Sequence, residues 1–253
     1  MAKDGVLMRI DGHIARLILN NPDKHNALGE EELLLLQNYI RQISDDGQLR
    51  VLIVTGAGDK TFCAGASLTQ LGTGQINGDF VQQTTDQLAC LKIPTICALN
   101  GNVYGGGVEL ALSCDFRIGV RGTHMRVPAA KMGLCYPLSG INRFVERLGV
   151  NLAKRILVAA EEFSAEDMLR LGFLDHLVGH LELQARTLDM AQSIAGLAPL
   201  AVQAMKQILD GAAQGSINID LAGGLSRVCA ESDDLQEGFA AQRAKRSPHF
   251  QGK

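Results

Sequence analysis

The chain has 253 residues, a net charge of −3 at pH 7 and 46% hydrophobic residues. This length suits one large domain, or one domain with a smaller appendage, and is sufficient to bury a sizeable core. A slightly acidic chain without a dense basic stripe lacks the electrostatic footprint of a nucleic-acid-binding protein, and no basic amphipathic segment predicts binding to a membrane surface. The composition therefore favours small-molecule chemistry, with no nucleic-acid and no membrane partner.

Six cysteines and six histidines are scattered along the chain without the paired spacing of a metal site. The N-terminal stretch lacks the apolar segment of a signal peptide. The most apolar stretch, residues 93–114, is interrupted by Asn100, Glu109 and a glycine cluster, which makes it a poor membrane span. We expect a reduced, cytoplasmic protein that holds no metal and no permanently bound cofactor.

The first part of the chain alternates predicted strands with a predicted helix. Polar and apolar residues alternate from Val6 to Leu19 around Asp11-Gly12, which predicts a β-hairpin. A run of glutamates beginning at Glu30 then opens a helix that is expected to end near Asp46-Gly47. A buried strand follows at residues 50–55. This alternation indicates an α/β layer rather than a helical bundle.

The remaining chain is expected to begin with a loop and to end in helices. Residues 62–78 are rich in Gly, Ser and Thr, which predicts a mobile surface loop able to cover a site. Further strands are expected at residues 95–99, 115–120 and 125–128, and helices at 79–91, 141–148, 152–160, from 164 to 172, 181–195, 199–209, 217–230 and 233–244. Because the last quarter is predicted to be entirely helical, we place a soft boundary between a core of residues 1–190 and a helical region of residues 191–253.

The stretch from Cys97 to Val120 contains three consecutive glycines, Gly105 to Gly107, between a predicted strand and a short predicted helix. Glycines let another molecule approach the backbone closely, and the first N–H groups of a helix lack intrahelical acceptors, so they can donate to an incoming oxygen. Glu109 is the one carboxylate among the apolar residues of that helix. The stretch therefore predicts a site for an oxyanion with a carboxylate beside it.

Two segments carry a resemblance to a known family: FCAGASL at residues 62–68, and ALNGNVYGGGVELAL at residues 98–112 with CDFRI behind it. They closely resemble the signature of the enoyl-CoA hydratase/isomerase (crotonase) superfamily, and the resemblance runs from the loop at residues 21–28 to the tail at residues 245–250. It implies an α/β fold with a repeated ββα spiral core and a C-terminal helical trimerisation region. It also implies a coenzyme A thioester as substrate, and a homotrimer or hexamer as the assembly.

The resemblance implies roles for residues of the glycine-rich stretch. By match to the family, the backbone N–H groups of Ala66 and Gly106 form an oxyanion hole that holds the thioester carbonyl oxygen as negative charge develops. Glu109 lies at the position of the first catalytic carboxylate of the hydratases. From the residues alone, Glu109 can also be the partner of an arginine such as Arg117 or Arg143 in a structural ion pair. We favour the catalytic role and keep the ion pair as the alternative.

The resemblance also implies contacts with coenzyme A. Candidates for the coenzyme or substrate contacts are Lys24, His25, Ala64, Ser67, Leu68 and Lys245. The basic residues among them are suited to phosphate groups and the adenine, with Lys245 acting from a neighbouring subunit, although each can also be an ordinary surface charge. Ser67 stands where the family commonly has an aspartate.

The chain departs from the family pattern after Pro128. Hydratases and simple enoyl-CoA isomerases have a glutamate at the next position, where this chain has Ala129, and a methyl group cannot move a proton. Residues 133–141, which include Tyr136, are similar to the corresponding segment of methylmalonyl-CoA decarboxylases, which also have a tyrosine there. Tyr136 can therefore be a catalytic residue beside Glu109, or a packing residue with its O–H bonded to the backbone.

These observations leave a leading hypothesis and two rivals. The leading hypothesis is an enoyl-CoA hydratase/isomerase-like enzyme, a lyase or an isomerase, that stabilises a thioester enolate. A decarboxylase of a short malonyl-CoA derivative is the enzymatic rival, because it needs an oxyanion hole but no second glutamate. A non-catalytic acyl-CoA-binding homologue is the rival from another class, and Ala129 is the residue that motivates it.

Overall fold

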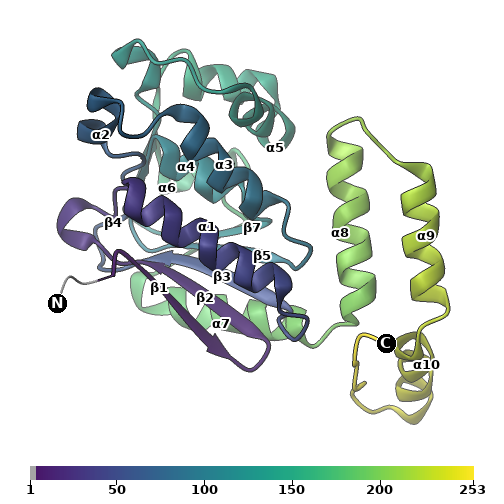
Figure 1. Ribbon diagram of the computed structural model, residues 1–253. Coiled ribbons are helices and arrows are strands. Elements are labelled where there is room, and N and C mark those ends of the chain that lie inside the picture. The colour runs from purple at the N-terminus through teal and green to yellow at the C-terminus, as the bar shows by residue number, and fades with distance from the viewer. Residues whose placement is uncertain (1–3) are drawn as a thin grey trace.

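The computed structural model describes residues 4–253, and the first three residues of the expected 1–190 core lie outside the described part (Figure 1). The larger sheet has the strand order β1-β2-β3-β5-β7-β10, and the smaller sheet has the order β4-β6-β8-β9. The strands of the larger sheet are β1 (Val6–Asp11), β2 (Ile14–Leu19), β3 (Val51–Gly56), β5 (Thr95–Leu99), β7 (Phe116–Val120) and β10 (His176–Val178). Those of the smaller sheet are β4 (Thr61–Cys63), β6 (Asn102–Tyr104), β8 (His124–Arg126) and β9 (Glu162–Ser164).

Helices surround both sheets. The α-helices are α1 (Glu30–Asp45), α2 (Leu68–Thr73), α3 (Gly78–Ala89), α4 (Gly106–Leu112), α5 (Leu138–Leu157), α6 (Ala165–Arg170), α7 (Leu183–Ala195), α8 (Pro199–Ala213), α9 (Ile219–Ala230) and α10 (Asp233–Ala244). Short 3₁₀ helices lie at η1 (Pro22–Lys24), η2 (Ala129–Met132) and η3 (His180–Glu182).

The strands of the larger sheet run parallel from β2 to β10, and apolar cores lie on both faces of this parallel part. Successive residues of β3 point to opposite faces: Leu52 and Val54 join the main core with α1, while Val51 and Ile53 pack in a second cluster with α7. Figure 1 shows α1 and α7 on the two sides of the sheet. The expected α/β layering is therefore confirmed.

The chain repeats one unit as it moves across the molecule. Each of the strands β3, β5 and β7 is followed by a short strand of the smaller sheet, β4, β6 or β8, and then by a helix. This is the repeated ββα core that the resemblance implies. Its consequence for the site is that the ends of β4 and β6, which pair in parallel, bring the loops after them together.

The expectation of an irregular loop over residues 62–78 is wrong in part, because β4 extends into this range and α2 lies within it. The hydroxyl of Ser67 accepts a hydrogen bond from the N–H of Gln70 at 3.5 Å and so caps the start of α2. The side chain of Gln70 in turn accepts from the N–H of Glu30 at 2.8 Å. Elements of three to six residues are too short to show a clear periodicity, which explains the missed strand and helix.

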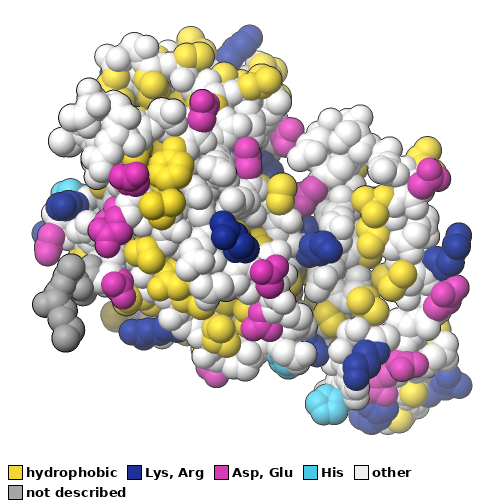
Figure 2. Space-filling model, in the orientation of Figure 1, with side chains coloured by type: hydrophobic (Ala, Val, Ile, Leu, Met, Phe, Trp, Pro, Cys, Tyr) yellow, Lys and Arg dark blue, Asp and Glu magenta, His cyan; other side chains and the backbone are white. Residues whose placement is uncertain are grey.

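Helices α8, α9 and α10 extend away from the two sheets (Figure 1). The arm that they form is tied to the core by Lys206, whose Nζ lies 2.6 Å from Oδ2 of Asp115. Large apolar side chains remain exposed along it, including Leu209 at 68% and Ile219 at 79%, and Figure 2 shows such side chains gathered there. No helix within residues 4–253 is long and apolar enough to cross a membrane. The division near residue 190 stays a prediction.

Candidate active site

Two backbone segments meet in front of α4. Gly65 has a φ of +85°, and a Cβ atom built there would lie 2.7 Å from the amide nitrogen of Gly106 and 2.9 Å from the carbonyl oxygen of Tyr104. A side chain at this position is excluded by both the conformation and the contact. A Cβ at Gly106 would in turn lie 3.5 Å from the amide nitrogen of Ala66. The loop after β4 and the start of α4 therefore touch through their main chains.

The N–H groups of Ala66 and Gly106 remain without protein acceptors within residues 4–253. On either side of Ala66, Gly65 and Ser67 pair with Leu28: the N–H of Leu28 donates to Gly65, and the N–H of Ser67 donates to Leu28, each at 2.8 Å. Gly106 is the first residue of α4, where no intrahelical acceptor exists. The two groups are therefore free donors placed close together, as a ligand oxygen requires.

Glu109 lies on the first turn of α4 and is only 2% exposed. Its Oε1 accepts hydrogen bonds from the Thr85 hydroxyl at 2.9 Å and from Nη1 of Arg143 at 3.0 Å. Burial raises the pKa of Glu109 above its ordinary value, although the charge of Arg143 and the hydrogen bond from Thr85 act in the opposite direction. A Cβ at Gly140 would lie 3.0 Å from Oε1, so a glycine on α5 leaves the space for the carboxylate.

Arg143 joins Glu109 to a second carboxylate on α3. Its Nη2 donates to Oδ1 of Asp86 at 2.5 Å, and the Ser139 hydroxyl donates to the same oxygen at 2.6 Å. Burial opposes the ionisation of Asp86, but the hydrogen bonds from Ser139 and Arg143 outweigh it and lower the pKa of this carboxyl. Of the two arginines considered as ion-pair partners, Arg143 contacts Glu109, whereas Arg117 pairs with Asp175 at 3.7 Å. The ion pair is thus present, and it leaves one carboxylate oxygen unoccupied.

Tyr136 lies beside Glu109 on the loop before α5. Its ring packs edge-on against Phe144, with 5.8 Å between the ring centroids. Burial raises the pKa of Tyr136 well above its ordinary value, and the negative charge of Glu109 adds to the rise. Within residues 4–253 the hydroxyl makes no hydrogen bond that would tie it to the backbone, so it is a neutral O–H available as a donor. Ala129, at the start of η2, is buried and supplies no acid.

The candidate contacts for coenzyme A fall into separate groups. His25 and Ala64 line one cleft of about 620 Å³, together with Lys60, Tyr104 and His180. The remaining candidates are Lys24 and Leu68, which are exposed, Ser67, which caps α2, and Lys245. Lys245 directly follows α10, which lies on the C-terminal arm apart from the two sheets (Figure 1), and it does not line this cleft. One chain therefore brings together the first loop and the segment at 64–68, but not the tail.

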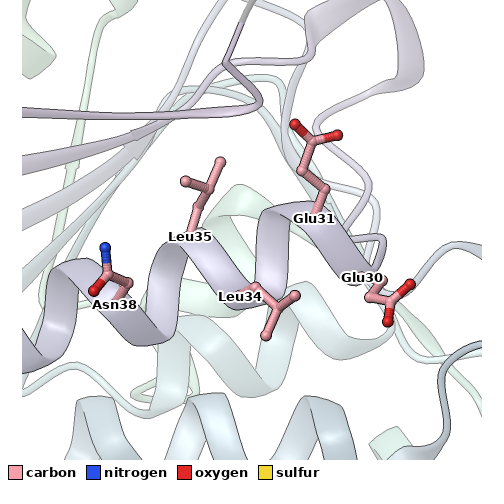
Figure 3. Close-up of a pocket in the computed structure, with 5 residues that line it drawn as sticks. All are labelled: Glu30, Glu31, Leu34, Leu35 and Asn38. Carbon is pink, nitrogen blue, oxygen red and sulfur yellow. The ribbon is translucent and has the colours of Figure 1, made fainter.

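Other hollows lack a comparable set of groups. A shallow hollow of about 390 Å³ on α1 is lined by Glu30, Glu31, Leu34, Leu35 and Asn38 (Figure 3). Figure 3 shows these side chains pointing to different sides of the helix, and none of them is bonded to Glu109. In the described part of the chain, no group of three or more His, Cys, Asp and Glu side chains is placed to hold a metal ion. Glu109 and the two free N–H groups thus form the best-defined candidate site.

Sequence reasoning missed the residues that surround Glu109. Thr85 and Asp86 lie on α3, whose buried positions form no distinctive motif. Ser139, Gly140 and Arg143 lie close together in the sequence on α5. Their roles depend on the packing of α3 against α5, which no short-range pattern reveals. The glycine at position 140, directly after a serine, was the one available signal for close backbone packing.

Comparison with known proteins gives the family of the chain. The family model described as enoyl-CoA hydratase/isomerase matches residues 9–253. The mitochondrial enoyl-CoA hydratase domain-containing protein 2 of Mus musculus is 34% identical over 256 residues, covering 95% of this chain and 85% of the mouse protein. The short-chain-enoyl-CoA hydratase of Clostridium acetobutylicum is 30% identical, covering 97% of this chain and 93% of that protein.

Solved structures agree with the sequence comparison. The crystal structure of an enoyl-CoA hydratase/carnithine racemase from Magnetospirillum magneticum superposes with a TM-score of 0.92 at 27% identity, and the match covers 100% of this chain and 97% of that one. The enoyl-CoA hydratase of Bacillus anthracis superposes with a TM-score of 0.89 at 28% identity, covering 98% of this chain and 100% of that one. The ββα core with its C-terminal helices is therefore a crotonase-type fold, and the chain belongs to the enoyl-CoA hydratase/isomerase family.

Proposed function

We propose that this protein converts acyl-CoA thioesters through an enolate that the N–H groups of Ala66 and Gly106 stabilise. The observation that carries the proposal is the pair of unpaired donors, held close together by the contact between Gly65 and Gly106. A single main-chain donor of this kind is worth roughly 2.7 to 4 kcal/mol of transition-state stabilisation in other enzymes. Two such donors therefore account for a large part of the decrease in the activation free energy of enolate formation.

Glu109 is the group that moves the proton at the carbon next to the thioester. It is buried on the first turn of α4, the helix that begins at Gly106, and a carboxyl whose pKa is raised is a stronger base than an ordinary carboxylate. Ala129 stands where a second glutamate would be, and Tyr136, whose pKa is raised by burial and then by Glu109, is the polar side chain that we assign to the site beside Glu109. The proposed chemistry therefore uses one carboxylate and one neutral phenol.

Decarboxylation of a short malonyl-CoA derivative is the second candidate function. Tyr136 favours it, because a neutral hydroxyl without a protein acceptor can donate to the carboxylate that leaves as carbon dioxide. The remaining electron pair would become the same enolate, on the same two N–H groups. No second acid is needed in this reaction, which fits the methyl group of Ala129.

A two-substrate assay tests which reaction the site performs. We expect the purified protein to convert either crotonyl-CoA, followed by the loss of absorbance of its double bond, or methylmalonyl-CoA, followed by release of carbon dioxide. Hydration without carbon dioxide release would contradict the decarboxylase, and the reverse result would contradict the hydratase. If calorimetry shows binding of acyl-CoA while a broad panel of thioesters remains unchanged, the chain is a non-catalytic binding homologue.

We also propose that His25, Ala64 and Leu68 contact the coenzyme of one subunit and that Lys24 lies near its phosphates. Lys245 would reach the coenzyme of a neighbouring subunit, since it lies on the C-terminal arm of its own chain. Ser67 serves the site through α2, whose first turn it caps, and so holds the main chain next to Ala66. This assignment explains why a short hydroxyl side chain suffices at position 67.

The apolar side chains of the C-terminal arm support a homotrimer or hexamer. Large exposed apolar patches mark interaction surfaces, and Leu209 on α8 is 68% exposed. Sedimentation velocity is expected to give a mass of three or six chains, and Leu209→Asp is expected to weaken the assembly. Leu181→Asp is the control, because Leu181 is 98% exposed outside the arm. A wild-type protein that sediments as a single chain would rule out this assembly.

A further inference from the structure

The Thr85 hydroxyl has one proton and two acceptors within reach. Its Oγ1 lies 2.9 Å from Oε1 of Glu109 and 2.9 Å from the carbonyl oxygen of Gln82, one turn earlier in α3. A hydroxyl donates one hydrogen bond at a time, and rotation about its C–O bond selects the acceptor. Thr85 can therefore donate to the carboxylate in one state of the site and to its own helix in another.

The two oxygens of Glu109 differ in their surroundings. Oε1 accepts from both Thr85 and Arg143, whereas Oε2 has no hydrogen-bond partner within residues 4–253. Within that range, the fully enclosed side-chain atoms that lack a partner are Gln87 Oε1 and Arg126 Nε, so Oε2 is not sealed in the protein. A proton that leaves or reaches Glu109 without breaking existing bonds must do so at Oε2.

We propose that Thr85 is a positioning residue that lets Glu109 change its protonation state in place, with Oε1 anchored and Oε2 exchanging the proton with the substrate. This inference rests on the proposed function. When Oε2 takes the proton from C2 of the thioester, the C–H bond breaks, an O–H bond forms, and the electron pair moves to the carbonyl oxygen as the enolate. Oε1 then loses negative charge, and the Thr85 hydroxyl turns to the carbonyl of Gln82. Return of the proton reverses each step.

The charged groups around Glu109 are consistent with this role. Arg143 on α5 favours the ionised form, and Asp86 on α3 disfavours it. Tyr136 faces Glu109 from the loop before α5 as a neutral group, because burial first of all, and then Glu109 and Cys63 on β4, raise its pKa. Because Arg143 is shared with Asp86, the Thr85 hydroxyl is the donor to Oε1 that can be withdrawn without leaving an unpaired charge.

Exchange of the C2 protons of butyryl-CoA for deuterium tests the inference without knowledge of the full reaction. The rate in D₂O, followed by mass spectrometry, is expected to rise with pH as Glu109 ionises. Thr85→Val removes a donor to the ionised form, which raises the pKa of Glu109. The midpoint of the profile is therefore expected to move up by about one pH unit, with an about tenfold lower rate at pH values below it. Thr85→Ser, which keeps the hydroxyl, is expected to restore the wild-type midpoint.

Thr84→Val is the matched control. Thr84 is the preceding residue of α3 and is equally buried, but its hydroxyl donates to Phe80 at 3.3 Å and accepts from Gln37 at 2.9 Å. It is expected to lower stability without moving the midpoint. Thr85→Ala removes the same hydroxyl if valine prevents folding. An unshifted midpoint in Thr85→Val and in Thr85→Ala, with exchange intact, overturns the role of Thr85. Absence of exchange in the wild type, or full exchange in Glu109→Gln, overturns the proposed function and this inference with it.

Discussion

Replacing Glu109 with glutamine is expected to lower kcat on the thioester that the protein converts by about 10²- to 10⁴-fold, the usual contribution of a general acid or base. The amide has nearly the same shape and its carbonyl oxygen can still accept from Thr85 and Arg143, but it cannot take up a proton. Steady-state kinetics with the substrate identified by the two-substrate assay measures the loss. Affinity for the thioester is expected to remain within a few fold, because Glu109 is not among the residues that we propose to contact the coenzyme.

Glu166→Gln is the control for this variant, because it makes the same change at a side chain of α6 that is 61% exposed. It is expected to leave kcat unchanged. A Glu109→Gln protein that loses stability while keeping its activity would contradict the catalytic role. That result would instead assign Glu109 to the structural ion pair with Arg143.

Replacing Gly65 with alanine is expected to lower kcat by about 10²- to 10³-fold, as removal of an oxyanion donor does in other enzymes. The new Cβ would lie 2.7 Å from the amide nitrogen of Gly106, so the two segments must separate and their N–H groups can no longer meet one oxygen. The left-handed backbone at a φ of +85° adds strain of about 1 to 3 kcal/mol. Kinetics and chemical denaturation at fixed protein concentration measure the two effects separately.

Gly172→Ala separates the strain from the contact. Gly172 has a φ of +79°, and a Cβ there meets nothing within 4 Å. It is expected to lose stability through its backbone conformation alone and to keep full activity. If Gly65→Ala behaves in the same way, the N–H groups of Ala66 and Gly106 do not act together on the substrate.

Much of the architecture could be predicted from local pattern. The alternation of strand and helix, the hairpin at Asp11-Gly12 and the buried strand β3 follow from periodicity and turn chemistry, which act over a few residues. The strands β4, β6, β9 and β10 have only three residues each, so their sequences carry no measurable period. They form because the packing of the whole chain brings them against a partner strand: β4, β6 and β9 pair with other short strands of the smaller sheet, and β10 pairs with β7.

The site could be predicted in part. The glycines at 105–107 and the isolated carboxylate of Glu109 were visible in the sequence, and the resemblance to the family supplied the pairing of Ala66 with Gly106. The choice between Arg117 and Arg143 could not be made, because it depends on how α5 crosses α4. Thr85 could not be found either, since a buried threonine on an amphipathic helix looks like an ordinary core residue.

The contact between Gly65 and Gly106 has a consequence for how such a protein can change over evolutionary time. The donors at Ala66 and Gly106 belong to the main chain, so substitutions of nearby side chains leave them in place as long as the glycines persist. Acids and hydroxyls around them, at positions such as 129 and 136, can then be exchanged one at a time. The anion-binding backbone thus stays the same while the reaction changes, and a new reaction needs only a new set of proton donors around it.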